Sequence, residues 1–163
     1  MSKTAVQRAK RNRTLTISDE EIALYSKNLK TLSEKVDDVS NQTICQNTFE
    51  ALKLLPENKF DLLFADPPYN LNKQFGENKF QQTTLDDYET WLNSWLSDCA
   101  KLLKKTASIY ICGDWRSASA IQRIGMKYFK LRNRITWERE KGRGANANWK
   151  NCSEDIWFFT VSD

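Results

Sequence analysis

The stretch Phe60-Asp61-Leu62-Leu63-Phe64-Ala65-Asp66-Pro67-Pro68-Tyr69-Asn70 decides the fold of this 163-residue chain. Its first half is a short apolar run that follows a break at Pro56, and this pattern predicts a buried strand. A carboxylate comes next, then two prolines that fix the backbone and donate no hydrogen bonds, then an aromatic ring. Ligands of open α/β sheets bind just outside the carboxyl ends of the strands. The sequence therefore predicts a site at this loop.

The residue types of the loop suit an exocyclic amine. The Asp66 carboxylate and the Pro67 carbonyl offer only acceptors, whereas an NH2 group carries two donors. Tyr69 supplies a flat face, and stacking of a base on such a face contributes about 1–3 kcal/mol. An adenine or cytosine flipped out of a duplex has both features. Holding both amine hydrogens on acceptors draws the nitrogen towards tetrahedral geometry and frees its lone pair for attack. A proline turn after an ordinary core strand is the alternative interpretation.

Four blocks of the sequence resemble the DNA amino-methyltransferases, which move a methyl group from S-adenosylmethionine to adenine N6 or cytosine N4. The first block is the Asp66-Pro67-Pro68-Tyr69 signature itself. The others are Leu52–Asp61 before it, Ser108–Trp115 after it and Trp149–Trp157 near the end. In this order the blocks are similar to the permuted (β-group) members of the family, whose catalytic half comes first.

The resemblance implies an α/β fold with a partial Rossmann-like, S-adenosylmethionine-dependent methyltransferase sheet and helices on both faces. It implies that Asp66 and the Pro67 carbonyl orient the amine, that Pro68 holds the turn and that Tyr69 stacks on the base, in a direct transfer without a metal. Adenine N6 is the favoured target, because Asp opens the signature where cytosine enzymes often have Ser. A DNA methyltransferase of a restriction-modification system is the function implied.

The resemblance also implies which residues border the cofactor, S-adenosylmethionine. These are Ala65 and Asp66 at the end of the predicted strand, and Asn47 in an earlier turn. Members of the family commonly have Gly-Asp at that turn, and this chain has Gln46-Asn47. Asn47 can still form hydrogen bonds but brings no charge.

One element of the family is missing from the sequence. Members hold the methionine part of the cofactor over a Phe-x-Gly-x-Gly turn, and of five glycines only Gly142 and Gly144 have that spacing, after a charged stretch that cannot be a buried strand. We interpret residues 19–163 as the catalytic half of a methyltransferase domain, without the cofactor turn and the target-recognition region. It is a fragment, a truncated product or one subunit of a split enzyme, with a complementary C-terminal half as partner. An apolar sheet edge and parts of both faces should then lie uncovered.

Composition is typical of a globular cytoplasmic protein. Hydrophobic residues make up 40% of the chain, which argues against disorder. The four cysteines have no Cys-x-x-Cys spacing, and Cys99 and Cys112 lie in apolar patterns typical of reduced core residues. The absence of histidine excludes Ser-His and Cys-His triads and removes the commonest metal ligand. No apolar run reaches the roughly 18 residues of a membrane span.

Two basic segments flank a mildly acidic body, within a net charge of +4. Residues 1–18 carry five basic and no acidic side chains and form a basic N-terminal arm, while residues 130–150 carry seven basic and two acidic ones. Such segments suit phosphate contacts, so double-stranded DNA is the expected partner. A solvated tail and a solvated hairpin loop are the alternatives. The candidate DNA-contacting residues are Trp115, Lys141, Arg143, Asn148, Trp149 and Lys150.

Trp115 and Asp114 follow a predicted strand directly, so both are expected to border the pocket. The resemblance makes Trp115 a candidate wall for the flipped base, and a residue at the entry of a helix is the alternative. The polar stretch 71–83 is a candidate lid over the site or an ordinary surface loop.

Periodicity and capping residues predict the remaining elements. Ser18 and Glu21 form a capping box for a helix over 19–35. Thr84 caps a helix that runs to about Lys104, and the one-sided apolar face of this helix indicates core packing. The other predicted elements are strands over 43–46, 107–112, 131–137 and 155–161 and helices over 49–55 and 116–126.

Two other functional classes stay open. The chain could be an inactive half-enzyme that binds DNA without transferring methyl groups, or a methyltransferase that acts on cytosine N4, RNA or protein. Binding of S-adenosylmethionine by the chain alone would separate the first class from an enzyme. Labelled methyl transfer to duplex DNA, RNA and protein, tested side by side, would decide among the substrates.

Overall fold

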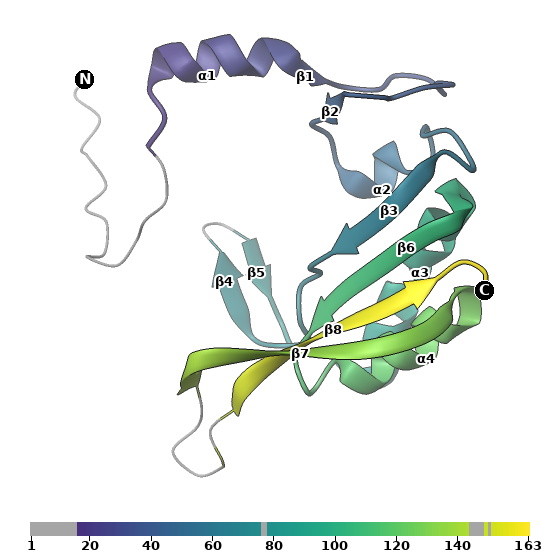
Figure 1. The fold of residues 1–163 in the computed structure, drawn as a ribbon. Helices are drawn as coiled ribbons and strands as arrows, with labels where there is room; N and C mark the ends of the chain where they lie inside the picture. Colours follow the sequence, from purple (N-terminus) through teal and green to yellow (C-terminus); the bar gives the residue numbers. More distant parts are fainter. Residues whose placement is uncertain (1–15, 76–77, 144–148, 150) are drawn as a thin grey trace.

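The computed structural model describes residues 16–75, 78–143, 149 and 151–163. A four-stranded sheet forms the body, and two long helices pack against it (Figure 1). No helix of these residues combines the length and apolarity needed to cross a membrane. The elements in chain order are α1 (Asp19–Tyr25), η1 (Ser26–Asn28), β1 (Leu29–Lys30), β2 (Thr43–Ile44), α2 (Thr48–Ala51), β3 (Phe60–Ala65), β4 (Lys73–Phe75), β5 (Asn78–Phe80), α3 (Leu85–Leu102), β6 (Leu103–Gly113), α4 (Ala118–Tyr128), β7 (Lys130–Arg143) and β8 (Asn151–Thr160).

The central sheet has the strand order β3-β6-β8-β7. β3 pairs in parallel with β6, and β8 lies antiparallel to both of its neighbours, β6 and β7. The strands β3, β6 and β7 therefore run in one direction and β8 runs against them. β8 follows β7 directly as a hairpin, which parallel strands cannot form without a crossover connection. This mixed sheet with connecting helices confirms the predicted α/β class.

Both long helices lie on the same face of the sheet (Figure 1). α3 connects β3 to β6 and α4 connects β6 to β7, and both connections cross the sheet in the same direction. Right-handed crossovers in one direction place their helices on one face. Beneath them, Ala107, Ile109 and Ile111 of β6 are at most 1% exposed. Gly125 of α4 lies so close to β8 that a Cβ atom there would be 2.5 Å from the Phe159 ring.

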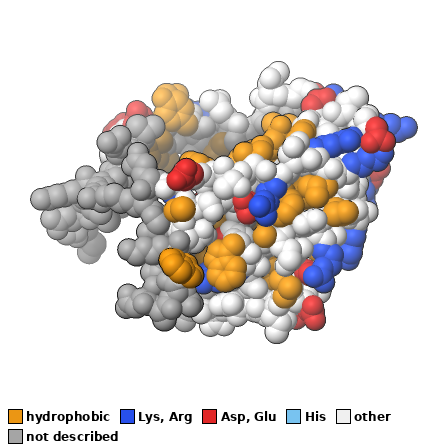
Figure 2. Space-filling model, turned by 60° about the horizontal axis from the view of Figure 1, so that its bottom comes forward, with side chains coloured by type: hydrophobic (Ala, Val, Ile, Leu, Met, Phe, Trp, Pro, Cys, Tyr) orange, Lys and Arg blue, Asp and Glu red, His pale blue; other side chains and the backbone are white. Residues whose placement is uncertain are grey.

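The opposite face of the sheet is open among the described residues. Leu62 and Phe64 of β3 are 56% and 62% exposed, and Ile135 of β7 is 45% exposed. The rings of Phe64, Tyr110 and Phe158 form a row across three neighbouring strands, in which Tyr110 and Phe158 stack with 4.8 Å between ring centroids. Figure 2 shows groups of exposed hydrophobic side chains on the side of the molecule that it presents. The two long helices thus cover one face only, so the prediction of helices on both faces is wrong for the described residues. The uncovered apolar surface is the other face and the edge strand β3, not parts of both faces.

The prediction of a helix over 19–35 is wrong beyond Tyr25. α1 ends there, and η1 and the short strand β1 follow, although the capping box between Ser18 and Glu21 is present. Every residue of α1 is exposed, so no tertiary packing extends the helix. The polar stretch 71–83 also differs from a simple loop, because it contains the antiparallel hairpin of β4 and β5. α3 begins after the Thr84 cap, as predicted.

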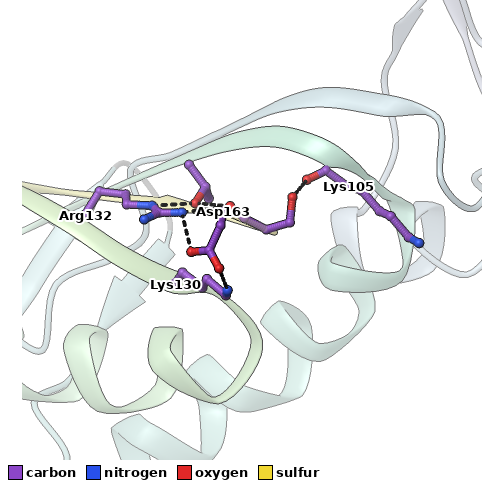
Figure 3. A network of polar contacts seen from close by, with 6 residues as sticks. Lys105, Lys130, Arg132 and Asp163 are labelled. Atoms are coloured by element: carbon purple, nitrogen blue, oxygen red, sulfur yellow. Dashed lines mark hydrogen bonds and ion pairs between the residues drawn. The ribbon is translucent and has the colours of Figure 1, made fainter.

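Polar contacts fasten the end of β8 to its neighbours (Figure 3). The Asp163 carboxylate forms ion pairs with Lys130 and with Arg132, whose Nη2 atom lies 3.1 Å away. The Ser162 hydroxyl donates a hydrogen bond of 2.7 Å to the Lys105 carbonyl of β6. These contacts join β6, β7 and the residues after β8 at the end of the sheet opposite to the loop that follows β3.

Candidate active site

The loop after β3 borders a hollow of about 300 Å³. It leaves the sheet at Ala65, which pairs in parallel with Ile111 near the end of β6. All four residues of the Asp-Pro-Pro-Tyr signature reach the hollow, at the end of the sheet where the sequence predicts a site. The lining residues are Asp66, Pro67, Pro68, Tyr69, Leu71, Phe80 and Glu154.

Asp66 and Tyr69 interact within the loop. Burial, followed by a hydrogen bond to the Asp66 carboxylate, raises the pKa of Tyr69 far above its ordinary value. The hydroxyl is therefore neutral across the working pH range and acts as a donor to the carboxylate. Cys112 lies close by on β6, and burial and then the Asp66 charge raise the pKa of its thiol. The loop thus presents an acceptor carboxylate beside an aromatic ring.

A second carboxylate, that of Glu154 on β8, lines the same hollow. It forms an ion pair with Arg139 of β7, and the Arg139 charge also acts on the Tyr69 hydroxyl. The sequence did not single out either residue. Local sequence does not distinguish Glu154 from its neighbour Asp155, and only the pairing of β8 with β6 and β7 brings it to this end of the sheet.

Three buried polar residues lie behind the loop, and the sequence did not single them out either. Asn70, Tyr88 and Ser117 are 8%, 5% and 0% exposed. Tyr88 packs in the apolar face of α3 as predicted, but its hydroxyl also donates a hydrogen bond of 3.0 Å to the Pro68 carbonyl. Burial raises the pKa of Tyr88 to about 12, so the hydroxyl keeps its proton for this bond.

A second hollow, of about 230 Å³, shares Pro68, Tyr69 and Phe80 with the first. α3 contributes Tyr88 and Trp91 to its wall, with 5.5 Å between their ring centroids. Tyr69 therefore borders two hollows, and its side chain can contact a ligand in either one.

Several predicted site residues do not line the hollow beside the loop. Asn47 caps α2, and its Oδ1 accepts a hydrogen bond of 3.0 Å from the backbone N–H of Phe49. Asp114 is buried, and its carboxylate accepts hydrogen bonds from the turn that leads into α4. Trp115 is 61% exposed, with the guanidinium of the next residue 4.7 Å from its ring centroid. The Trp115 ring is thus largely exposed at the surface and contacts the Arg116 guanidinium.

The other predicted DNA-contacting residues belong to the β7–β8 hairpin. Lys141 and Arg143 lie in the last part of β7, and Trp149, which is 98% exposed, lies between the two strands. Asn148 and Lys150 lie outside the described residues. Figure 1 shows that β7 and β8 extend beyond the body of the sheet. The described residues among them, Lys141, Arg143 and Trp149, thus lie on the β7–β8 hairpin, which we call the projecting arm.

The fold and the loop define the class of protein. The family model described as DNA methylase (N6_N4_Mtase) matches residues 60–163, and the chain belongs to this family. The match confirms the resemblance to DNA amino-methyltransferases that the Asp-Pro-Pro-Tyr signature indicates.

Curated relatives agree with the family. The chain is 35% identical over 127 residues to the type II methyltransferase M.HpaI of Haemophilus parainfluenzae. It is also 35% identical over 106 residues to the DNA adenine methyltransferase YhdJ of Escherichia coli strain K12. These matches cover 75% and 64% of this chain but 39% and 36% of the relatives. The chain therefore spans less than half the length of these relatives.

Solved structures share the fold. The cytosine-N4-specific PvuII DNA methyltransferase superposes with a TM-score of 0.59 at 16% identity, over 81% of this chain and 54% of that one. The protein TTHA0409 of Thermus thermophilus, in complex with S-adenosylmethionine, gives a TM-score of 0.55 at 20% identity, over 71% and 53% of the two chains. At these identities the likeness concerns the fold, and it confirms a methyltransferase-type α/β sheet.

Proposed function

We propose that this chain is the catalytic half of a DNA methyltransferase that transfers a methyl group from S-adenosylmethionine to adenine N6, as part of a restriction-modification system. The observation that carries the proposal is the convergence of Asp66, Pro67 and Tyr69 on one hollow in a member of the DNA methylase family. The names of the relatives support it, since YhdJ is a DNA adenine methyltransferase and M.HpaI a type II methyltransferase. DNA as the substrate agrees with a cytoplasmic location.

In this proposal the loop binds and orients the base. The Asp66 carboxylate and the Pro67 carbonyl accept the two amine hydrogens, Pro68 holds the turn, and Tyr69 stacks on the ring for about 1–3 kcal/mol. S-adenosylmethionine, when bound, supplies the methyl group on a positively charged sulfonium. The amine nitrogen would take the methyl group as the carbon–sulfur bond of the sulfonium breaks, and one amine proton would pass to the Asp66 carboxylate that accepts it and from there to water. Positioning and electrostatics supply the acceleration, without a covalent bond to the protein.

The described residues fit one part of the cofactor. The Asp66 carboxylate borders the hollow and suits a neighbouring positive charge such as a sulfonium or an ammonium group, whereas the Glu154 carboxylate is already paired with Arg139. Ala65 would border the same region from the end of β3. Asn47 would need to leave its capping bond, or to bind through its free amide NH2, in order to contact the cofactor. We propose that the remaining walls of the cofactor site come from a complementary half.

This complementary C-terminal half, in the same polypeptide or in a second subunit, would complete the domain that residues 19–163 begin. The open face with Leu62, Phe64 and Ile135 supports the proposal, because exposed apolar patches mark interaction sites. The edge strand β3 supports it as well, since an open strand edge pairs readily with another chain. We expect the chain alone to bind S-adenosylmethionine weakly or not at all and to self-associate, and calorimetry tests this. Micromolar binding by a monomeric chain would contradict the half-enzyme proposal.

Double-stranded DNA is the proposed partner of the projecting arm and of the basic segment 1–18. Cations and amides of the arm would contact phosphates and base edges, and the exposed Trp149 would stack on a base. Trp115 would border the flipped base from the turn before α4. The remaining proposed contacts are Lys141, Arg143, Asn148 and Lys150.

Labelled methyl transfer tests the function. The chain, with its complementary half, is incubated with labelled S-adenosylmethionine and duplex DNA, RNA or protein, and the products are hydrolysed and separated. We expect label on adenine N6 of DNA. Asp66→Ala should abolish the transfer, and Asp66→Asn should retain more activity because it keeps one oxygen acceptor. Asp98→Ala, which removes a surface carboxylate paired with Lys101 on α3, is the matched control and should transfer at the parental rate.

Other outcomes of this experiment select the alternatives. Label on cytosine N4, RNA or protein would assign a different substrate to the same loop. Binding of DNA without any transfer would indicate an inactive half-enzyme. Transfer by Asp66→Ala at the parental rate would contradict the proposed role of the loop.

A further inference from the structure

The loop cannot hold its own shape through backbone hydrogen bonds. Pro67 and Pro68 have no N–H groups, and the backbone bond within the described loop region is the short turn from the Leu71 N–H to the Tyr69 carbonyl, at 2.6 Å. The geometry of a loop that must present acceptors to a reacting amine therefore depends on side chains from other elements. Among the described residues, α3 and the turn before α4 provide such side chains, and the loop's own Asn70 side chain bonds to the backbone of Thr83.

Asn70 joins the end of the loop to the start of α3. Its Oδ1 accepts from the Thr83 N–H at 2.8 Å, and its Nδ2 donates to the Thr83 carbonyl at 3.0 Å. The Asn70 side chain thus pairs with both the N–H and the carbonyl of Thr83, as the backbone of a neighbouring strand would. A second bond, from the Gln82 N–H to Asn72 Oδ1 at 2.9 Å, closes the same segment. Together the two contacts close the base of the β4–β5 hairpin, which carries Phe80 into both hollows.

Ser117 and Tyr88 hold the middle of the loop. The backbone N–H of Asn70 donates to Ser117 Oγ at 3.4 Å, and the Ser117 hydroxyl donates in turn to the buried Asp114 carboxylate at 2.9 Å. The Tyr88 hydroxyl donates to the Pro68 carbonyl at 3.0 Å. The contacting side chains are almost fully buried, so water competes little for these bonds.

We propose that Asn70, Tyr88 and Ser117 are positioning residues for the methyl transfer: they hold the loop through hydrogen bonds, and they do not line the hollow that Asp66 borders. That these residues serve methyl transfer rests on the proposed function. That they hold the loop rests on the hydrogen bonds alone. A displacement of reacting groups by a fraction of an ångström lowers the rate while leaving binding largely intact. Loss of these residues should therefore lower kcat and leave KM for DNA and for S-adenosylmethionine nearly unchanged.

Hydrogen exchange of the chain tests whether the loop is held. In Tyr88→Phe and Ser117→Ala, the amides of the segment 66–72 should exchange about tenfold faster than in the parent, since each variant loses one buried hydrogen bond to the loop. Ser117→Ala also loses the bond from the Ser117 hydroxyl to Asp114. Tyr128→Phe is the matched control. It removes a tyrosine hydroxyl that donates to Asn93 of α3 at 2.9 Å but does not contact the loop. Equal exchange in all three variants would overturn the proposal.

Kinetics of the complete enzyme test whether the held loop matters for transfer. Tyr88→Phe should lower kcat about tenfold at unchanged KM, and Tyr128→Phe should keep the parental kcat. A rise in KM at parental kcat would overturn the positioning role. If the parental enzyme transfers no methyl group to any substrate, the proposed function fails, and the exchange experiment still decides whether these residues hold the loop.

Discussion

The two faces of the central sheet are built from similar residues and differ in how well they are covered. Under α3 and α4, Ile109, Ile111 and Phe159 are at most 1% exposed. On the other face, Leu62 and Phe64 are more than half exposed. Each square ångström of apolar surface left in water forfeits about 25 cal/mol of stabilisation. The described chain therefore has a buried core on one face of the sheet and exposed apolar side chains on the other.

The loop after β3 lies where the two faces meet. Its supports, Tyr88 and Ser117, come from the covered side, whereas Cys112 precedes the end of β6 with its side chain on the open side. The chain thus holds this loop through residues on its covered side, while the open face beside the loop stays uncovered among the described residues. This arrangement is the one that a catalytic half needs if a second half is to bring the cofactor.

The largest expected difference between the two faces is the loss of stability when Phe159 or Phe64 is replaced by alanine. Phe159→Ala should lower the free energy of unfolding by about 3–5 kcal/mol, because it opens a cavity in a fully buried core. Phe64→Ala makes the same chemical change on the open face and should cost less than about 1 kcal/mol. Urea unfolding of both variants measures the difference. Similar losses would mean that the open face is covered in solution, for example by a second copy of the chain.

A charge on the open face should separate stability from assembly. Phe64→Arg should weaken binding of the complementary half at least tenfold, about 1.4 kcal/mol, because aromatic side chains at interface centres carry much of the affinity. The stability of the chain alone should change by less than about 0.5 kcal/mol. Trp149→Arg, at an exposed aromatic of the β7–β8 hairpin, is the control for a non-specific charge effect. Calorimetric titration with the complementary half measures both variants, and equal affinities would remove the open face from the interface.

Elements with local determinants could be predicted from the sequence. The apolar run before Asp66 correctly predicted a strand, β3, but the prediction that this strand is buried is wrong, because β3 is an edge strand of the described sheet and none of its residues is buried. The Thr84 cap with the apolar stripe behind it predicted α3. The capping box at Ser18 is also correct, but a cap specifies only where a helix begins. α1 stops at Tyr25 because its apolar residues find no surface in the described chain, and propensity alone does not sustain a helix of that length.

The supports of the site could not be predicted, because they depend on contacts between residues distant in sequence. Asn70 meets a partner 13 residues away, Tyr88 one 20 residues away and Ser117 one 47 residues away. Nothing in the local pattern distinguishes Tyr88 from the other aromatic residues of the α3 stripe. Glu154 reaches the hollow only through the pairing of β8 with its neighbours. The chemistry of the loop is readable in sequence, whereas its support is a property of the fold.

Thiol reactivity gives a finer measure of the same contrast. Cys99 lies on the buried side of α3, and burial, followed by the Asp98 charge, raises its pKa to about 11, so little thiolate exists near neutral pH. Cys112 is only partly covered. At mildly alkaline pH a thiol reagent should label the exposed Cys45 and Cys152 first, Cys112 more slowly and Cys99 only on unfolding. Mass spectrometry measures the labelling rate at each cysteine. The proposed complementary half should slow the labelling of Cys112 alone. Rapid labelling of Cys99 in the native protein would contradict a closed core.

The smallest expected effect concerns the contacts at the far end of the sheet, which depend on neither face. The hydrogen bond from Lys130, and next its charge, lower the pKa of Asp163 below the ordinary value of 3.8. A carboxyl whose pKa is lower in the folded state stabilises that state above the unfolded pKa, and this contribution disappears as the pH falls through the folded pKa. Asp163→Asn should therefore slightly lower the midpoint of urea unfolding near neutral pH and have no effect in strong acid. The shift should be small, because exposed ion pairs are screened by solvent. A difference between parent and variant that persists in strong acid would mean that the substitution disturbs packing instead of removing a charge contact.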